Sequence, residues 1–226
     1  MTTILITGAG RGIGLALAKE ALIRGWRVVG SVRGAAEARE LERALGAGSK
    51  ALVFDVTDAA AVAKAAGMLE ESIDILINNA GVIGPERQSA LDMDFDGLRQ
   101  TLEVNTLAPL RVAEAFLPHL KRSENPRVLT ISSDMGSMSH GGFDRLAYRI
   151  SKVAVNKAMQ GLAAELQRHN VALAIVHPGW VRTDMGGRSA SLSPEESAKG
   201  VLDVAERLTI ANTGQFVSHD GRQMPW

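Results

Sequence analysis

Tyr148 and Lys152 are the first pair of side chains in this sequence whose spacing suggests chemistry. Tyr148 is the only tyrosine, and the chain around the pair contains no proline and reads as a helix. Positions four apart lie on one face of a helix, so the phenol and the ammonium would be neighbours. A nearby cation lowers the pKa of a phenol from its usual value near ~10. Lowering it to about 7 requires roughly 4 kcal/mol of preferential stabilisation of the phenolate. The pair therefore predicts a tuned acid–base group, with an ordinary surface pair as the alternative.

A glycine-rich turn near the start of the chain predicts a site for phosphates. Thr3 to Thr7 reads as a buried strand, and the helix that follows the turn runs to about Arg24. Glycines allow close approach of the backbone, and the N-terminus of a helix stabilises negative charge. This order of elements favours a bound dinucleotide over an ordinary glycine-containing loop. The candidate cofactor-binding residues of the turn are Gly8, Arg11, Gly12, Ile13 and Gly14.

The residues after the second predicted strand indicate which dinucleotide this is. An acidic residue at this point would bind the ribose 2′-OH of NAD, but the sequence here is Ser31-Val32-Arg33. Arg33, with Arg11 as a second cation, predicts binding of a 2′-phosphate and hence NADP(H) in preference to NAD(H). Two solvated arginines are the alternative. Asp55, after the third strand, has two open roles: acceptor for the adenine amino group, or cap of the next helix.

The segment from Leu98 to Leu120 predicts a long helix that is apolar on more than one face. Asn105 lies in its middle, where asparagine is mildly unfavourable. Pro109 has no N–H to donate to the carbonyl of Asn105, so a local kink would leave that oxygen free to hold a water.

The whole chain predicts one domain, residues 1–226, of the α/β class. Seven short strands alternate with helices, which predicts a doubly wound Rossmann fold with a single seven-stranded parallel sheet and helices on both faces. Ligands bind such sheets at the carboxyl ends of the strands. The predicted strands run from Thr3 to Thr7, Arg27 to Val32, Lys50 to Phe54, Asp74 to Ile77, Arg127 to Ile131, Val171 to Val176 and Gly214 to Ser218.

The composition argues against several other classes of protein. The net charge is +0, so nothing favours binding to nucleic acid or to an anionic membrane. The absence of cysteine excludes disulfides and thiol catalysis, and the five histidines do not have the spacing of metal ligands. No signal-peptide pattern and no apolar run of membrane-spanning length is present. We therefore expect a cytoplasmic protein without a metal site.

Several motifs, in this order along the chain, resemble those of the short-chain dehydrogenase/reductase family. Residues 7–14 are similar to its TGxxxGxG cofactor turn, residues 78–81 to its NNAG motif, and Pro178-Gly179 with Thr183 to its nicotinamide loop. The resemblance covers the whole chain, and residues 148–152, 177–187 and 220–226 resemble the sniffer/C-factor branch. It implies a catalytic tetrad of Asn105, Ser133, Tyr148 and Lys152. It also implies further cofactor contacts from Asp55, Val56, Asn79, Ala80, Gly81, Tyr148, Lys152, Pro178, Gly179, Val181 and Thr183.

The resemblance implies an NADPH-dependent oxidoreductase that transfers hydride between nicotinamide and a small carbonyl or alcohol. Tyr148 would exchange the proton, Ser133 would hydrogen-bond the same oxygen, and Lys152 would lower the pKa of Tyr148 and bind the nicotinamide ribose. Ser133 precedes Tyr148 by 148 − 133 = 15 residues, slightly more than is usual in the family, so Ser132 is the alternative serine. A small lid and an open site are expected after Thr183.

Residues for a substrate pocket are less clearly marked. Side chains that suggest an apolar ketone or aldehyde, with plain packing as the alternative, are Met135, Met138, Phe143, Trp180 and Met185. The two broadly apolar helices, residues 98–120 and 148–166, predict a homodimer. The main functional alternative is a nucleotide-sensing signalling protein of the C-factor type with incidental turnover. A methyltransferase is a weaker alternative, because it leaves Tyr148 and Lys152 unexplained.

Overall fold

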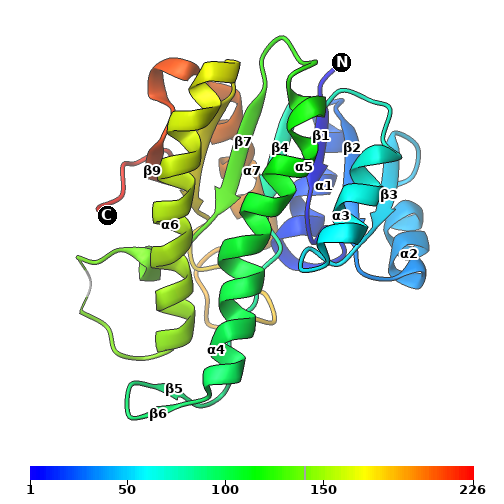
Figure 1. The fold of residues 1–226 in the computed structure, drawn as a ribbon. Coiled ribbons are helices and arrows are strands. Elements are labelled where there is room, and N and C mark those ends of the chain that lie inside the picture. Colours follow the sequence, from blue (N-terminus) through cyan, green and yellow to red (C-terminus); the bar gives the residue numbers. More distant parts are fainter. Residues whose placement is uncertain (140) are drawn as a thin grey trace.

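A seven-stranded parallel sheet forms the centre of the molecule (Figure 1). It is seen in a computed structural model that describes residues 1–139 and 141–226. The strand order is β3-β2-β1-β4-β7-β8-β9. Successive strands are added on one side of β1 as far as β3 and then on its other side from β4 onward. This confirms the doubly wound architecture expected from the sequence, and it places a ligand-binding switch point at the carboxyl ends of β1 and β4. The strands are β1 (Thr3–Ile6), β2 (Arg27–Val32), β3 (Ser49–Val53), β4 (Ile75–Asn78), β7 (Arg127–Ile131), β8 (Ala172–His177) and β9 (Gln215–Ser218).

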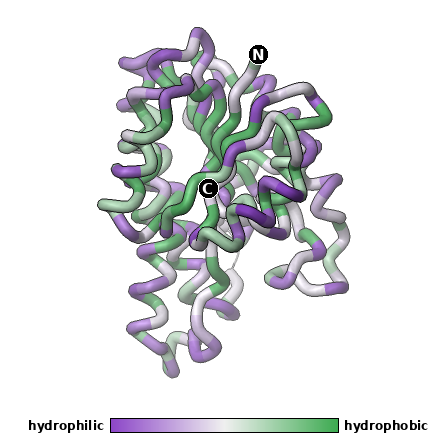
Figure 2. The backbone as a smooth tube through the Cα atoms, turned by 90° about the vertical axis from the view of Figure 1, so that its right-hand side faces the viewer, coloured by the Kyte–Doolittle hydropathy of each residue, from purple (hydrophilic) through white to green (hydrophobic). Residues whose placement is uncertain are grey.

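Helices cover both faces of the sheet and enclose two apolar cores (Figure 1). One face packs against α1, α2 and α7, and the other packs against α3, α5 and α6. Hydrophobic segments gather along the central strands, and hydrophilic ones lie on the outer turns (Figure 2). The helices are α1 (Gly12–Ile23), α2 (Ala35–Leu45), α3 (Ala59–Gly67), α4 (Phe95–Leu102), α5 (Ala108–Leu120), α6 (Leu146–Leu166) and α7 (Pro194–Arg207).

Short polar side chains fix where several helices begin. The carboxylate of Asp58 accepts from Ala61 N at 2.9 Å and so caps the start of α3. Ser193 caps α7 by accepting from Glu196 N at 3.1 Å, and Glu196 returns a bond to Ser193 N at 2.7 Å. Such reciprocal caps satisfy N–H groups that have no partner inside the helix.

The long helix expected from Leu98 to Leu120 is interrupted in the structure. A π-helical segment, η1 (Glu103–Leu107), separates α4 from α5 and contains Asn105. Pro109 follows as the second residue of α5, and because proline has no N–H, the regular hydrogen-bond ladder of the helix is broken here. The kink expected from the sequence thus takes the form of a π segment.

The smaller elements of the fold were not predicted from the sequence. They are a two-stranded hairpin, β5 (Gln88–Ser89) with β6 (Asp92–Met93), and the 3-10 turns η2 (Asp134–Gly136), η3 (Gln167–His169) and η4 (Ile210–Asn212). Within the described part of the chain, no helix has both the length and the apolar character needed to cross a bilayer.

Candidate active site

Tyr148 lies in the first turn of α6 and points into the protein. Its side chain is 8% exposed and hydrogen-bonds with the side chain of Ser133, which follows the end of β7. Burial raises the pKa of Tyr148 to about 12, and the nearby carboxylate of Asp134 acts in the same direction. The hydrogen bond with Ser133 and the charge of Arg145 lower this pKa but do not outweigh burial. The phenol is therefore protonated at neutral pH.

Lys152 lies one turn further along α6, on the same face. Its Nζ donates to the carbonyl oxygen of Ile131 at 2.8 Å and lies 5.5 Å from the ring centroid of Tyr148. Only 5% of the residue is exposed, and burial lowers the pKa of Lys152 to about 8. The spacing of four thus brings the two side chains together as the sequence predicted.

The expected direction of the pKa shift at Tyr148 is wrong for the protein alone. We expected Lys152 to lower this pKa towards about 7, but burial of the phenol raises it. The reason is geometric, because the amine of Lys152 is held by a main-chain carbonyl and faces the ring. Its own charge is also disfavoured by burial.

The two consecutive serines point in different directions. Ser132 donates to Asn156 Oδ1 at 2.5 Å and is 1% exposed, so its hydroxyl is part of the packing between β7 and α6. Ser133 is the serine that meets Tyr148. The geometry therefore favours Ser133 over the alternative, Ser132, as the serine of the site.

The side chain of Asn105 is occupied by structural hydrogen bonds. Its amide exchanges two bonds of 2.8 Å with the backbone of Val82 and donates to Ser151 Oγ at 2.9 Å. Ser151 in turn donates to the carbonyl of Tyr148 at 2.7 Å. Asn105 thus connects the loop after β4 with the first turns of α6. If Asn105 binds a water, the acceptor is therefore its backbone carbonyl oxygen and not its side chain.

The glycine turn fits a dinucleotide pyrophosphate. Gly8 and Gly12 have φ of 66° and 53°, which side chains other than glycine rarely adopt. A Cβ on Gly14 would lie 2.2 Å from Gly8 O, so this position also requires glycine. The N-terminus of α1 has no side-chain cap at Arg11 and no acidic residue in its first turn. Its N–H groups remain available to an anion.

Thr7 and Asn79 hold this turn against the end of β4. Thr7 Oγ1 accepts from the backbone N–H groups of Asn79 and Ala80 at 3.0 and 3.1 Å. The side-chain amide of Asn79 donates to Thr7 O and Gly8 O at 2.9 and 3.2 Å. The side-chain amide of Asn79 therefore holds the glycine turn in place.

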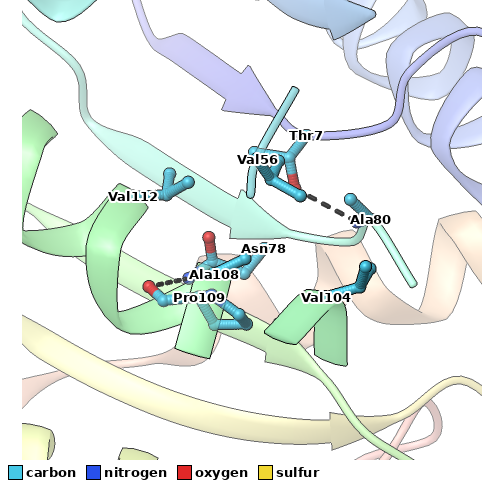
Figure 3. A pocket seen from close by; sticks show the side chains of 8 residues that line it. All are labelled: Thr7, Val56, Asn78, Ala80, Val104, Ala108, Pro109 and Val112. Atoms are coloured by element: carbon cyan, nitrogen blue, oxygen red, sulfur yellow. Dashed lines mark hydrogen bonds between the residues drawn. The ribbon is translucent and has the colours of Figure 1, made fainter. Parts of the chain in front are cut away.

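Two of the expected cofactor contacts line a narrow crevice at the switch point of the sheet. Val56 and Ala80 meet there, together with residues of η1 and α5 (Figure 3). Asn78 donates from Nδ2 to Pro109 O at 3.3 Å across the crevice. The residues that line it are Thr7, Val56, Asn78, Ala80, Val104, Ala108, Pro109 and Val112.

Arg33 and Arg11 differ in their ion pairs within the chain. The guanidinium of Arg33 is exposed, has no ion pair with the described residues and lies near enough to Asp55 to lower its pKa. The main cause of that lowered pKa is Thr57, which donates to Asp55 Oδ1 from its backbone N–H and its hydroxyl at 2.8 and 2.7 Å. Asp55 therefore forms a local turn, and the helix cap is Asp58. Arg11 is paired with Asp184 at 2.8 Å.

The loop after β8 reaches back to the glycine turn. Gly179 has φ of 83°, and a Cβ there would lie 2.3 Å from Leu192. Thr183 lies against Gly12, since a Cβ on that glycine would be 3.4 Å from the Thr183 methyl. The loop thus brings Pro178, Val181 and Thr183 to the same edge of the sheet as the glycine turn.

The residues expected to form the substrate pocket are mostly exposed. Phe143 is 89% exposed, Met138 77% and Trp180 54%, and the indole N–H of Trp180 donates to Gly186 O at 2.9 Å. Met185 is 38% exposed, and Met135 is partly buried beside Ser133. Most of these side chains are therefore exposed on the surface of the chain and do not enclose a cavity.

Comparison with known proteins identifies the family. The family model for short chain dehydrogenase matches residues 2–192. The chain belongs to the short-chain dehydrogenase/reductase family. It is 40% identical to the C-signal of Myxococcus xanthus over 158 residues, which are 68% of this chain and 93% of that protein. The solved structure of carbonyl reductase Sniffer of D. melanogaster matches with a TM-score of 0.92 and 31% identity over the full length of both chains. The NADPH-bound carbonyl reductase from chicken fatty liver matches with a TM-score of 0.92 and 28% identity, covering 100% of this chain and 99% of that one.

These relatives confirm the resemblance to the sniffer/C-factor branch and contradict the methyltransferase alternative. In this short-chain dehydrogenase the sequence analysis missed Asp134, which accepts a hydrogen bond from Ser133, and His177, which contacts Asp134. An acidic residue directly after the predicted serine was the available signal.

Proposed function

We propose that this short-chain dehydrogenase is an NADPH-dependent carbonyl reductase in which Tyr148 is the proton donor. The observation that carries the proposal is the buried group of Tyr148, Ser133 and Lys152, at the edge of the sheet where β1 ends in the glycine turn. A protonated phenol is the form that a general acid needs, and burial keeps Tyr148 in that form at neutral pH.

A bound reduced nicotinamide would supply the hydride for the carbonyl carbon. Tyr148 gives its proton to the carbonyl oxygen as charge develops there, and Ser133 hydrogen-bonds the same oxygen. Lys152, which lies beside the phenol, binds the nicotinamide ribose. Asn105 holds the loop after β4 and the start of α6 in register, and its backbone carbonyl holds a water that returns the proton.

The coenzyme preference rests on Arg33. Its guanidinium is exposed at the end of β2, where no carboxylate takes the place of a ribose-binding acid. A planar guanidinium binds a phosphate bidentately, which favours NADP(H) over NAD(H). Structural relatives bound to NADPH or NADP support this preference.

We propose that the substrates are small apolar carbonyl compounds. Met135, Phe143, Trp180 and Met185 are the apolar side chains proposed to contact them. We place the protein in the cytoplasm and propose that it acts as a homodimer, with no nucleic acid or membrane as partner.

The decisive variant is Tyr148→Phe. It removes the proton donor but keeps the ring, so we expect NADPH-dependent reduction of a carbonyl panel to fall by roughly three orders of magnitude or more. The dissociation constant for NADPH, measured by fluorescence titration, should change by less than about threefold. Turnover like that of the wild type would overturn the assignment of Tyr148. Tight NADPH binding by the wild type without turnover of any carbonyl would support the signalling alternative instead.

A further inference from the structure

Gln88 connects the start of α6 with the loop that follows β4. It lies in β5, and the hairpin of β5 and β6 is found at the end of α4 where that helix begins (Figure 1). Its Oε1 accepts from Tyr148 N, 60 residues further along the chain, at 3.2 Å. Its Nε2 donates to Pro85 O at 2.6 Å and to Ile83 O at 3.3 Å. The side chain of Gln88 thus makes three hydrogen bonds that join two separate segments.

The chemistry of these partners fixes the orientation of the Gln88 amide. An amide group has one oxygen that accepts and one nitrogen that donates, and the carbonyls of Ile83 and Pro85 can only accept. The nitrogen must therefore face these two carbonyls, and the oxygen must face the N–H of Tyr148. A flipped amide would place oxygen against oxygen and N–H against N–H. A side chain that only donates or only accepts cannot make all three bonds.

The first turn of α6 needs such an acceptor, because the first N–H groups of a helix have no partner inside it. The first regular bond of α6 runs from Arg149 N to Arg145 O at 3.0 Å, so the N–H of Tyr148 is the last of the free groups. Arg145, at the N-cap, has φ of 51°, and its side chain makes no capping bond among the described residues. Tyr148 is only 8% exposed, so an unpaired N–H there would be unfavourable. Gln88 supplies the cap from a distant segment.

The loop after β4 also holds the carbonyl side of Tyr148. Asn105, which exchanges bonds with the backbone of Val82, donates to Ser151 Oγ at 2.9 Å. Ser151 in turn donates to Tyr148 O at 2.7 Å. The backbone of Tyr148 is thus held at its N–H by Gln88 and at its carbonyl by Ser151. Both sets of bonds lead back to residues 82–88.

We propose that Gln88 is a positioning residue, which caps α6 from outside the helix and fixes the place of Tyr148 relative to the reacting carbonyl. This inference rests on the proposed function, in which Tyr148 gives its proton to that carbonyl. A displacement of about 1 Å in a reacting group can lower a rate by roughly 10²-fold. Loss of the Gln88 bond should therefore lower kcat for carbonyl reduction and leave the binding of NADPH almost unchanged.

The single tyrosine allows a direct test that needs no turnover. Selective isotopic labelling of tyrosine nitrogen gives one backbone amide signal by NMR, which belongs to Tyr148. Gln88→Met keeps the length of the side chain but removes its polar group, so we expect this amide to exchange with solvent at least roughly tenfold faster. The control is Arg87→Ala, which removes the exposed ion pair with Asp92 in the same hairpin and should leave the exchange unchanged. An unchanged exchange rate in Gln88→Met would overturn the inference.

Steady-state kinetics then tests whether this bond matters for proton donation. Gln88→Met should lower kcat for carbonyl reduction roughly tenfold, with a KM for NADPH within about twofold of that of the wild type. Gln88→Glu keeps an oxygen for the N–H of Tyr148 but removes the donor to Ile83 and Pro85. A carboxylate is also favourable at a helix N-terminus, so this variant should keep the amide protected and retain most of kcat. Arg87→Ala should keep full kcat.

The outcomes separate the bond to Tyr148 from the other contacts of Gln88. Equal losses of kcat in Gln88→Met and Gln88→Glu would place the effect in the contacts to the loop and would refute the inference. Fast amide exchange with unchanged kcat in Gln88→Met would refute it as well. Urea denaturation followed by tryptophan fluorescence checks that Gln88→Met folds. If it does not, Gln88→Glu decides alone, and loss of amide protection in that variant would overturn the inference. A fully active Tyr148→Phe would instead refute the proposed function, so the two failures are distinguishable.

Discussion

At the scale of single residues, burial of the Lys152 amine lowers the stability of the fold. This amine is buried against the carbonyl of Ile131, and burial is what lowers its pKa to about 8. A buried amine of this kind is a feature of functional sites, where proteins accept a loss of stability. Burial also raises the pKa of Tyr148, which keeps the phenol protonated. The site therefore holds a weak acid, Tyr148, next to an amine whose pKa is lowered, Lys152.

The linkage between this pKa and stability predicts the effect of Lys152→Met. Below pH 8 the lysine is charged in both the folded and the unfolded chain, and its burial lowers the free energy of unfolding. Between about 8 and 10.5 only the unfolded chain keeps the proton, so the free energy of unfolding of the wild type should rise with pH by up to about 3 kcal/mol. Lys152→Met should remove this rise and stabilise the chain at neutral pH by about 1–2 kcal/mol. The gain is smaller than about 3 kcal/mol because Ile131 O loses its donor.

Urea denaturation at several pH values measures this effect. Lys157→Met is the matched control, because Lys157 is exposed on the same helix and its amine donates to Gln160 Oε1 at 2.8 Å. A rise with pH that survives in Lys152→Met would show that Lys152 is not its source.

The residue scale also shows where sequence reasoning stops. The spacing of Tyr148 and Lys152 was enough to predict that they share a face of α6, because helix geometry is local. The direction of the Tyr148 pKa shift was not, since it depends on burial under distant segments and on the carbonyl of Ile131 that takes the amine. Asp134 was missed because its partner His177 comes from another strand.

At the scale of elements, the loop between β2 and α2 decides how a 2′-phosphate can be bound. The N-terminal N–H groups of this helix would be natural phosphate ligands, but Glu37 already accepts from Arg33 N and Gly34 N at 3.1 and 3.0 Å. The carboxylate of Glu37 therefore occupies the N–H groups that a phosphate would need at the start of α2. Recognition of a 2′-phosphate is left to the guanidinium of Arg33.

Arg33→Asp should therefore change the coenzyme preference. We expect the KM for NADPH to rise roughly tenfold or more, because a charge-assisted bidentate contact is replaced by repulsion, while the KM for NADH changes by less than about threefold. Steady-state kinetics with both coenzymes measures the ratio. Arg39→Asp, at an exposed position in α2 itself, is the control and should leave the ratio unchanged. Equal rises for both coenzymes would count against Arg33 as the 2′-phosphate ligand.

The helices and strands of the fold were the features predicted best from the sequence. All seven sheet strands were predicted within about two residues, because short β-branched runs bounded by glycine and polar residues mark buried parallel strands. The π segment at Glu103–Leu107 was foreseen only as a kink, since the form it takes depends on packing against α6. The hairpin β5–β6 has two-residue strands, too short for any periodicity to appear.

At the scale of the whole molecule, the strand order brings distant residues to one edge of the sheet. Gly8 follows β1, Asn79 follows β4, Ser133 follows β7 and Pro178 follows β8, and these strands are neighbours in that order. This convergence was predictable, because parallel sheets with right-handed crossovers place their carboxyl ends together. The conformation of the segments over residues 134–139, 141–145 and 178–192 was not predictable, since their sequences have no regular pattern.

Exposed apolar side chains on η1 and α6 support the proposed homodimer. Leu107 of η1 is 47% exposed and Ile150 of α6 is 36% exposed, while the opposite faces of α5 and α6 are buried in the core. The two helices lie side by side on the outside of the molecule (Figure 1). A second copy placed on this face would cover both side chains and form a four-helix contact, which needs about 800 Å² from each partner to be stable.

Leu107→Glu tests this arrangement. Because Leu107 is half exposed in the single chain, a charge there should hardly change folding of the monomer, but in the dimer it would be desolvated beside apolar groups at a cost of several kcal/mol. Light scattering after size exclusion should therefore give twice the 24.0 kDa chain mass for the wild type and the single mass for the variant. Leu91→Glu is the control, because Leu91 lies fully exposed in the turn of the β5–β6 hairpin, away from this face. A wild-type monomer, or a Leu107→Glu dimer, would rule out association through α5 and α6.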